Sequence, residues 1–111
     1  MNKLITIFIF FFSLHAQSQD RCESWGCIST ISILTTKSDG VIYVGTPLDE
    51  TLANCTPVSG AYFTLNPASG NANMVYSALL ATYMSGKKIN LRVKEGHPQC
   101  ELDYVHFDAA Y

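Results

Sequence analysis

The chain has little positive charge and no cluster of it. Its 111 residues include seven lysines and arginines against nine acidic residues, so its net charge is −2 at pH 7. Proteins that bind nucleic acid or anionic membranes concentrate lysine and arginine on one surface, because their partners are densely negative. We therefore expect this chain to bind neither.

The motifs of common catalytic sites are also lacking. The sequence contains no Gly-x-Ser-x-Gly elbow, and the SGKK stretch at residues 85–88 lacks the upstream glycine of a phosphate-binding loop. Asp103 and His106 are close in sequence, but their odd offset places them on opposite faces of a strand. No pair of carboxylates stands out. We expect a non-enzymatic protein without a cofactor.

Long apolar runs are confined to the N-terminus. Lys3 precedes an almost wholly apolar stretch from Leu4 to Leu14, and Ala16-Gln17-Ser18 follows. A membrane-spanning helix needs about 20 apolar residues, whereas a short run ending in a small-x-small pattern is typical of a signal peptide. The sequence therefore predicts a signal peptide at residues 1–18. It also predicts a secreted or periplasmic domain at residues 19–111, with no membrane span after cleavage.

All four cysteines lie after the predicted cleavage site. An even number of cysteines in an exported chain favours disulfides, although four cysteines allow three pairings. We favour a long bridge between Cys55 and Cys100 and a short one between Cys22 and Cys27. A metal site is the alternative, because His97-x2-Cys100 has ligand-like spacing. We expect no metal, since the paired Cys-x2-Cys signature of a zinc site is absent.

Alternating and β-branched residues predict five strands, and one stretch has helical periodicity. The helix is expected from Asn73 to a glycine end at Gly86, with Val75 and Leu79 on its buried face. The strands are expected at residues 27–36, 41–46, 61–65, 88–94 and 100–108, with a long loop at residues 47–60. The order β-β-β-α-β-β predicts a mainly β, OB-fold-like small barrel stabilised by disulfides. A two-layer sheet with one helix across it is the competing fold.

The stretch from Asn73 to Val93, NMVYSALLATYMSGKKINLRV, resembles a segment of a known family. It is similar to the helix-then-strand segment of the OB-fold B subunits of bacterial AB-type toxins, such as subtilase cytotoxin, pertussis-like toxins and type II heat-labile enterotoxins. The resemblance implies a homo-oligomeric, ring-forming subunit that binds cell-surface glycan and accompanies a catalytic toxin chain. It also implies that Ser29 and Thr30 contact sugar, as hydroxyl residues near the first strand do in that family.

Aromatic residues add candidates for the same role. Sugar sites combine aromatic faces with hydroxyl and amide groups, and Trp25, Tyr43 and Tyr62 could supply the aromatic faces. The alternative for Trp25 is packing over a disulfide, and for Ser29 and Thr30 an ordinary place in a strand. We expect a secreted, non-enzymatic binding module. The alternative function is that of a monomeric periplasmic protein that binds or inhibits another protein.

Overall fold

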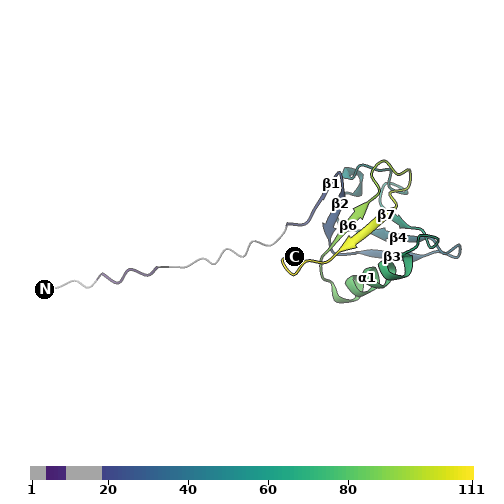
Figure 1. Ribbon diagram of the computed structural model, residues 1–111. Coiled ribbons are helices and arrows are strands. Elements are labelled where there is room, and N and C mark those ends of the chain that lie inside the picture. The colour runs from purple at the N-terminus through teal and green to yellow at the C-terminus, as the bar shows by residue number, and fades with distance from the viewer. Residues whose placement is uncertain (1–4, 10–18) are drawn as a thin grey trace.

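The computed structural model describes residues 5–9 and 19–111 (Figure 1). The predicted signal peptide falls mainly outside these residues and stays a prediction. Within the described residues there is no helix long and apolar enough to cross a membrane. The described residues form seven strands, a 3-10 turn and one α-helix: β1 (Arg21–Glu23), β2 (Gly26–Ser29), β3 (Ile33–Thr36), β4 (Ile42–Gly45), η1 (Glu50–Leu52), β5 (Phe63–Leu65), α1 (Ala72–Ser85), β6 (Ile89–Val93) and β7 (Leu102–His106).

The strands form two antiparallel sheets, which confirms a mainly β chain with one helix. The first sheet has the order β1-β2-β6-β7, and the second has the order β3-β4-β5. The single strand predicted at residues 27–36 is divided into β2 and β3, one in each sheet. Ser32, between them, donates its backbone N–H to Gly45 O at 2.9 Å. The segment therefore crosses from one sheet to the other.

The two sheets do not close into a barrel, so the predicted OB-fold-like barrel is not confirmed. On the side away from the β2–β3 crossing they meet at one isolated parallel bridge between Thr64 and Glu101. There the Thr64 N–H donates to Cys100 O at 3.1 Å. β5 ends at Leu65, before an Asn-Pro turn, and β7 begins only at Leu102. Too few residues of β5 and β7 lie side by side to form a continuous ladder.

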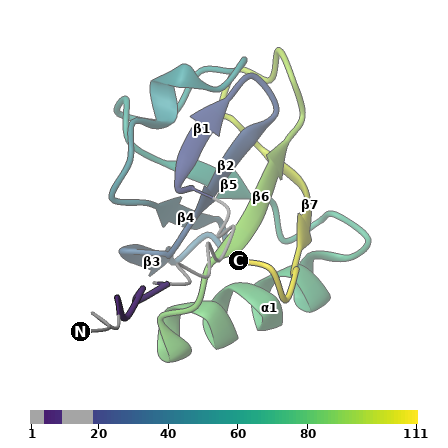
Figure 2. The same ribbon diagram turned by 90° about the vertical axis from the view of Figure 1, so that its left-hand side faces the viewer.

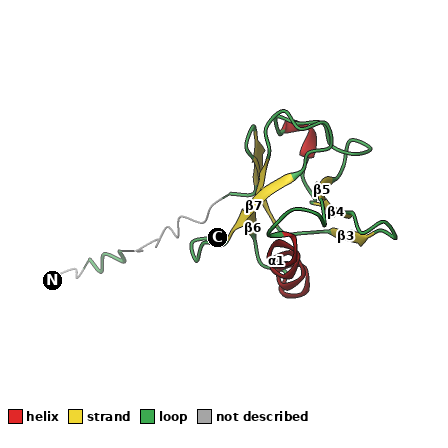
Figure 3. Ribbon diagram, turned by 45° about the vertical axis from the view of Figure 1, so that its right-hand side comes forward, coloured by secondary structure: helices red, strands yellow, loops and turns green. Residues whose placement is uncertain are grey.

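The helix lies across one end of both sheets (Figures 2 and 3). Its buried residues are Ala72, Val75, Leu79 and Thr82, which includes the face predicted from the spacing. The helix ends as predicted at Gly86, whose φ of 68° is left-handed and whose N–H donates to Thr82 O at 2.9 Å. The helix therefore covers the apolar space between the sheets.

Both predicted disulfides are present in the fold. Cys22 and Cys27 are directly opposed on β1 and β2 and are bonded to each other. Cys55 and Cys100 join the loop after η1 to the segment before β7. β1 and η1 were not expected from the sequence, because each is only three residues long. β1 is held by its pairing with β2, and η1 begins where the Asp49 side chain accepts the Thr51 N–H.

Candidate functional site

Two tyrosines stack on the outer face of the second sheet. Alternation along β4 points Ile42 and Val44 into the core and leaves Tyr43 on the outer face. Tyr62 lies on the same face, just before β5. The two rings are 5.5 Å apart between centroids with an interplanar angle of 13°. We call this pair the tyrosine platform.

Ile33 and Gly45 extend the platform toward β3. Ile33 is 41% exposed and faces Gly45 across the β3–β4 pair. A Cβ atom at Gly45 would lie 3.1 Å from Ile33 Cβ and 3.4 Å from Tyr62 Cδ1. The missing side chain therefore lets Ile33 and Tyr62 approach each other over β4. This sheet face therefore carries an exposed isoleucine beside two half-buried tyrosines.

Lys37 lies at the opposite end of the platform. Its Nζ is 4.9 Å from the centre of the Tyr43 ring and 3.3 Å from the Tyr43 hydroxyl. The hydrogen bond with Tyr43 and the charge of Asp39 together raise the pKa of Lys37. Lys37 therefore keeps its charge at neutral pH and lies over the face of the Tyr43 ring.

A small polar pocket adjoins the platform at Thr64, the register partner of Tyr43. Its volume is about 180 Å³. It lies where the end of β4–β5 meets the segment before β7. Its lining residues are Val41, Thr64, Asn66, His97, Gln99 and Glu101.

Glu101 holds one wall of the polar pocket together. Its carboxylate lies 3.2 Å from Lys94 Nζ and 3.1 Å from His97 Nε2, and it accepts a hydrogen bond from the Ser69 hydroxyl at 3.0 Å. Burial raises the pKa of Glu101, but the hydrogen bonds from Lys94 and Ser69 and the nearby charges outweigh burial and lower it. Glu101 is therefore an ionised, fully partnered carboxylate.

His97 closes the turn that carries this wall. Its Nδ1 accepts the backbone N–H groups of Gln99 at 3.1 Å and Glu101 at 3.3 Å. Because Nδ1 accepts, the neutral ring carries its proton on Nε2, which then donates to the Glu101 carboxylate. The neighbouring Cys100 is bonded to Cys55. These groups fix the backbone of the pocket.

Trp25 lies on the first sheet, apart from the tyrosine platform. The ring is flanked by the guanidinium groups of Arg92 at 4.2 Å and Arg21 at 5.9 Å. Its indole N–H donates to Glu23 at 2.8 Å. Trp25 also sits inside the loop that the Cys22–Cys27 bridge closes. The contacts of the Trp25 ring are therefore with charged side chains of the first sheet and not with the platform.

The two hydroxyl candidates do not join the platform. Ser29 is 0% exposed and lies on the core face of β2, where its hydroxyl has no hydrogen-bond partner among the described residues. Its side chain is therefore not available to a sugar at the surface of this fold. Thr30 is half-buried at the crossing between the sheets. Of the five predicted sugar contacts, the structure brings together only Tyr43 and Tyr62.

Sequence reasoning did not single out Asn66 or Gln99. A signal for Asn66 was present, because Tyr62, Thr64 and Asn66 continue the outward alternation of β5. Gln99 has no such signal. It reaches the pocket through the parallel bridge beside Thr64, a contact between residues far apart in the chain.

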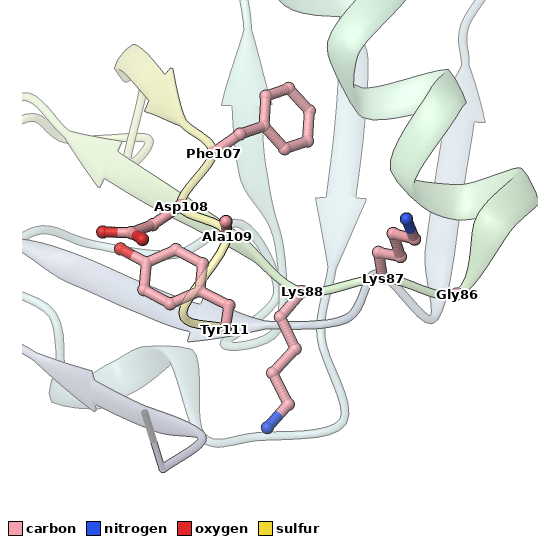
Figure 4. A pocket seen from close by; sticks show the side chains of 7 residues that line it. All are labelled: Gly86, Lys87, Lys88, Phe107, Asp108, Ala109 and Tyr111. Carbon is pink, nitrogen blue, oxygen red and sulfur yellow. The ribbon is translucent and has the colours of Figure 1, made fainter. Parts of the chain in front are cut away.

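A second and larger cavity of about 570 Å³ lies between the turn after α1 and the C-terminal residues. Figure 4 shows that the amino groups of Lys87 and Lys88 extend to opposite sides, while Phe107 and Tyr111 point in different directions. Lys88 forms an ion pair with Asp20 at 2.7 Å. Because its functional groups do not converge, we assign the candidate site to the tyrosine platform and the polar pocket.

Comparisons with known proteins add no relative of this chain. No protein-family model, curated protein or solved structure matches it significantly. Among residues 5–9 and 19–111, no group of three histidine, cysteine or acidic side chains is placed to hold a metal ion. The geometry of the tyrosine platform and the polar pocket is therefore the basis for assigning a function.

Proposed function

We propose that this chain is an exported, non-enzymatic module that binds carbohydrate on the tyrosine platform. The main observation in support is that Tyr43 stacks on Tyr62 beside a polar pocket. Sugars present apolar ring faces that pack on aromatic side chains and polar edges that bind amides and hydroxyls. The two disulfides are consistent with an extracellular or periplasmic location.

The order of the strands supports an OB-like architecture as part of this proposal. With β2 and β3 taken as one bent strand, the neighbours run β3-β4-β5 and β2-β6-β7, with the single bridge between β5 and the start of β7. OB-folds bind oligosaccharides on the face of their second and third strands. The corresponding strands here are β4 and β5, which carry the platform.

The side-chain partners around the site support a role in binding rather than catalysis. Glu101 and His97, the titratable groups of the pocket, are engaged with each other and with the backbone of their own turn. A general acid or base needs a free proton-transfer position facing the substrate. These two groups instead shape the pocket wall.

The test measures carbohydrate binding by the oxidised protein, first on a glycan array and then by titration calorimetry. Replacing Tyr62 with alanine removes one ring of the platform and should weaken binding about tenfold, the equivalent of about 1.4 kcal/mol. Trp25→Phe is the matched control, because it changes an aromatic residue on the other sheet and should leave affinity unchanged. No binding to any glycan, or equal losses in both variants, would contradict the proposal.

A second candidate function is self-association through α1. The helix has no charged residue, and its outer surface exposes Met74 by 74%, Leu80 by 42%, Tyr83 by 46% and Met84 by 76%. Grouped exposed apolar side chains mark interaction surfaces. We propose a second copy of this chain as the partner.

Size-exclusion chromatography coupled to light scattering tests this association, because it measures the molar mass of the protein in solution. We expect a multiple of the monomer mass, and Leu80→Lys should shift the protein to the monomer mass. Glu95→Lys, in an exposed loop, is the control that should leave the mass unchanged. A monomer at all concentrations would instead favour the alternative of a monomeric protein that binds another protein.

A further inference from the structure

The polar pocket is too small to enclose a whole sugar ring together with the substituents of that ring. Its volume is about 180 Å³, below the roughly 300–1,000 Å³ of sites that enclose a complete small ligand. The tyrosine platform adjoins it at Thr64, and the two stacked rings are half-buried. A sugar ring on the platform would therefore place one substituent in the pocket. The identity of that substituent can be read from the pocket's lining.

The charges in the pocket are already neutralised from within. The Glu101 carboxylate is held by Lys94 at 3.2 Å and His97 at 3.1 Å. Both nitrogens of His97 are engaged by its own turn and by Glu101. A charged substituent would find no free counter-charge in the pocket, and desolvating it without a partner is costly. The pocket is therefore suited to a neutral group.

The remaining lining residues are two amides, one aliphatic side chain and Thr64, whose hydroxyl already donates to Gln99 O at 3.0 Å. The Gln99 side-chain amide has no hydrogen-bond partner among the described residues, so both its N–H and its C=O groups are available. Asn66 uses its Oδ1 to accept the Ala68 N–H, which leaves its side-chain N–H groups as donors. Val41 adds an apolar wall. These groups complement a substituent with one N–H, one C=O and a methyl group.

We propose that the polar pocket receives the 2-acetamido group of an N-acetylhexosamine whose ring lies on the tyrosine platform. The acetamido N–H and C=O pair with Gln99 and Asn66, and the methyl group contacts Val41. This inference rests on the proposed carbohydrate-binding function and names the class of sugar. Binding is non-covalent, and no bond in the sugar is made or broken.

The test measures the binding of two trisaccharides to the oxidised protein, produced from the full-length chain, by titration calorimetry. One is the N-acetylglucosamine trimer N,N′,N″-triacetylchitotriose, called chitotriose below, and the other is cellotriose. The two trisaccharides share the same β-1,4-linked skeleton and differ in the 2-acetamido groups. We expect chitotriose to bind at least tenfold more tightly. Equal affinity for both would overturn the acetamido assignment while leaving carbohydrate binding intact. Binding of neither, or binding only of a peptide that carries acetyl-lysine, would overturn the proposed function and this inference together.

A substitution at Gln99 separates the pocket from the platform. Gln99→Leu keeps the size of an exposed side chain but removes both hydrogen-bonding groups, so the fold should be unaffected. Chitotriose affinity should fall about fivefold, the equivalent of one hydrogen bond, while cellotriose affinity stays unchanged. Lys87→Ala, which lies in the larger cavity, is the control and should change neither affinity. Unchanged chitotriose binding by Gln99→Leu would overturn the assignment.

Discussion

The two disulfides should contribute unequally to stability, because they close loops of different length. The Cys55–Cys100 bridge spans 45 residues of sequence, and the Cys22–Cys27 bridge spans five. A cross-link stabilises the fold mainly by restricting the unfolded chain, and the restriction grows with the logarithm of loop length. In this account the long bridge contributes about 4 kcal/mol to the free energy of unfolding and the short one about 2 kcal/mol.

Paired cysteine-to-alanine variants allow a matched comparison of the two bridges. Each bridge joins one fully buried cysteine, Cys100 or Cys27, to one partly buried cysteine, Cys55 or Cys22. The losses from cavity formation should therefore be similar and should cancel in the comparison. The difference that remains reports loop closure.

Urea unfolding followed by far-ultraviolet circular dichroism measures this difference. With a slope of about 1 kcal/mol per molar urea for a domain of this size, removing the long bridge should lower the midpoint by about 4 M and removing the short one by about 2 M. A domain with a typical stability of about 5–15 kcal/mol would stay folded without the short bridge. Equal losses, or a larger loss for the short bridge, would refute the loop-length reasoning.

Three further predictions concern the framework of the fold. Gly26→Ala should lower the free energy of unfolding by about 3 kcal/mol or more, because a Cβ atom there meets the Leu91 carbonyl oxygen and φ is +137°; Gly70→Ala, with open space around it, is the calorimetric control. The folded-state pKa of Glu101 lies below its ordinary value of 4.5, so its contribution to stability is present above pH 4.5 and is lost as pH falls through the folded pKa. The urea midpoint of the unchanged protein should therefore fall between about pH 5 and pH 3, and in Glu101→Gln it should fall less. An equal fall of the midpoint in both proteins would contradict this. Glu50→Gln should lower the free energy of unfolding, measured with urea, by about 2 kcal/mol. The reason is that the buried Glu50 carboxylate accepts hydrogen bonds from both the backbone N–H and the hydroxyl of Thr46.

Local pattern was a reliable guide where an element is long enough to have a period. The helix was predicted from the three- and four-residue spacing of Val75 and Leu79, and these two side chains are buried. Strict alternation likewise predicted the strand at residues 88–94, of which Ile89–Val93 is observed. The favoured disulfide pairing, one of the three that four cysteines allow, is the pairing observed.

Local pattern failed where a contact between distant segments decides the outcome. The stretch at residues 27–36 has the same β-branched composition throughout, so nothing in it marks the crossing near Ser32 that separates β2 from β3. The two sheets stay open on the side away from this crossing because Thr64 of β5 and Glu101, just before β7, form only one isolated bridge. Ser29 was treated as a surface hydroxyl, yet the register of β2 against β6 places it on the core face.

The sequence by itself determined the class of this protein: a small, disulfide-linked, mainly β fold with one helix. These properties depend on composition, periodicity and cysteine count, which are local or additive. Only the tertiary structure decided which side chains form the site. It stacked Tyr43 on Tyr62, moved Trp25 to the other sheet and brought Gln99 beside Thr64. The physical reason is that strand register and sheet crossing depend on pairing between distant residues, which no single segment encodes.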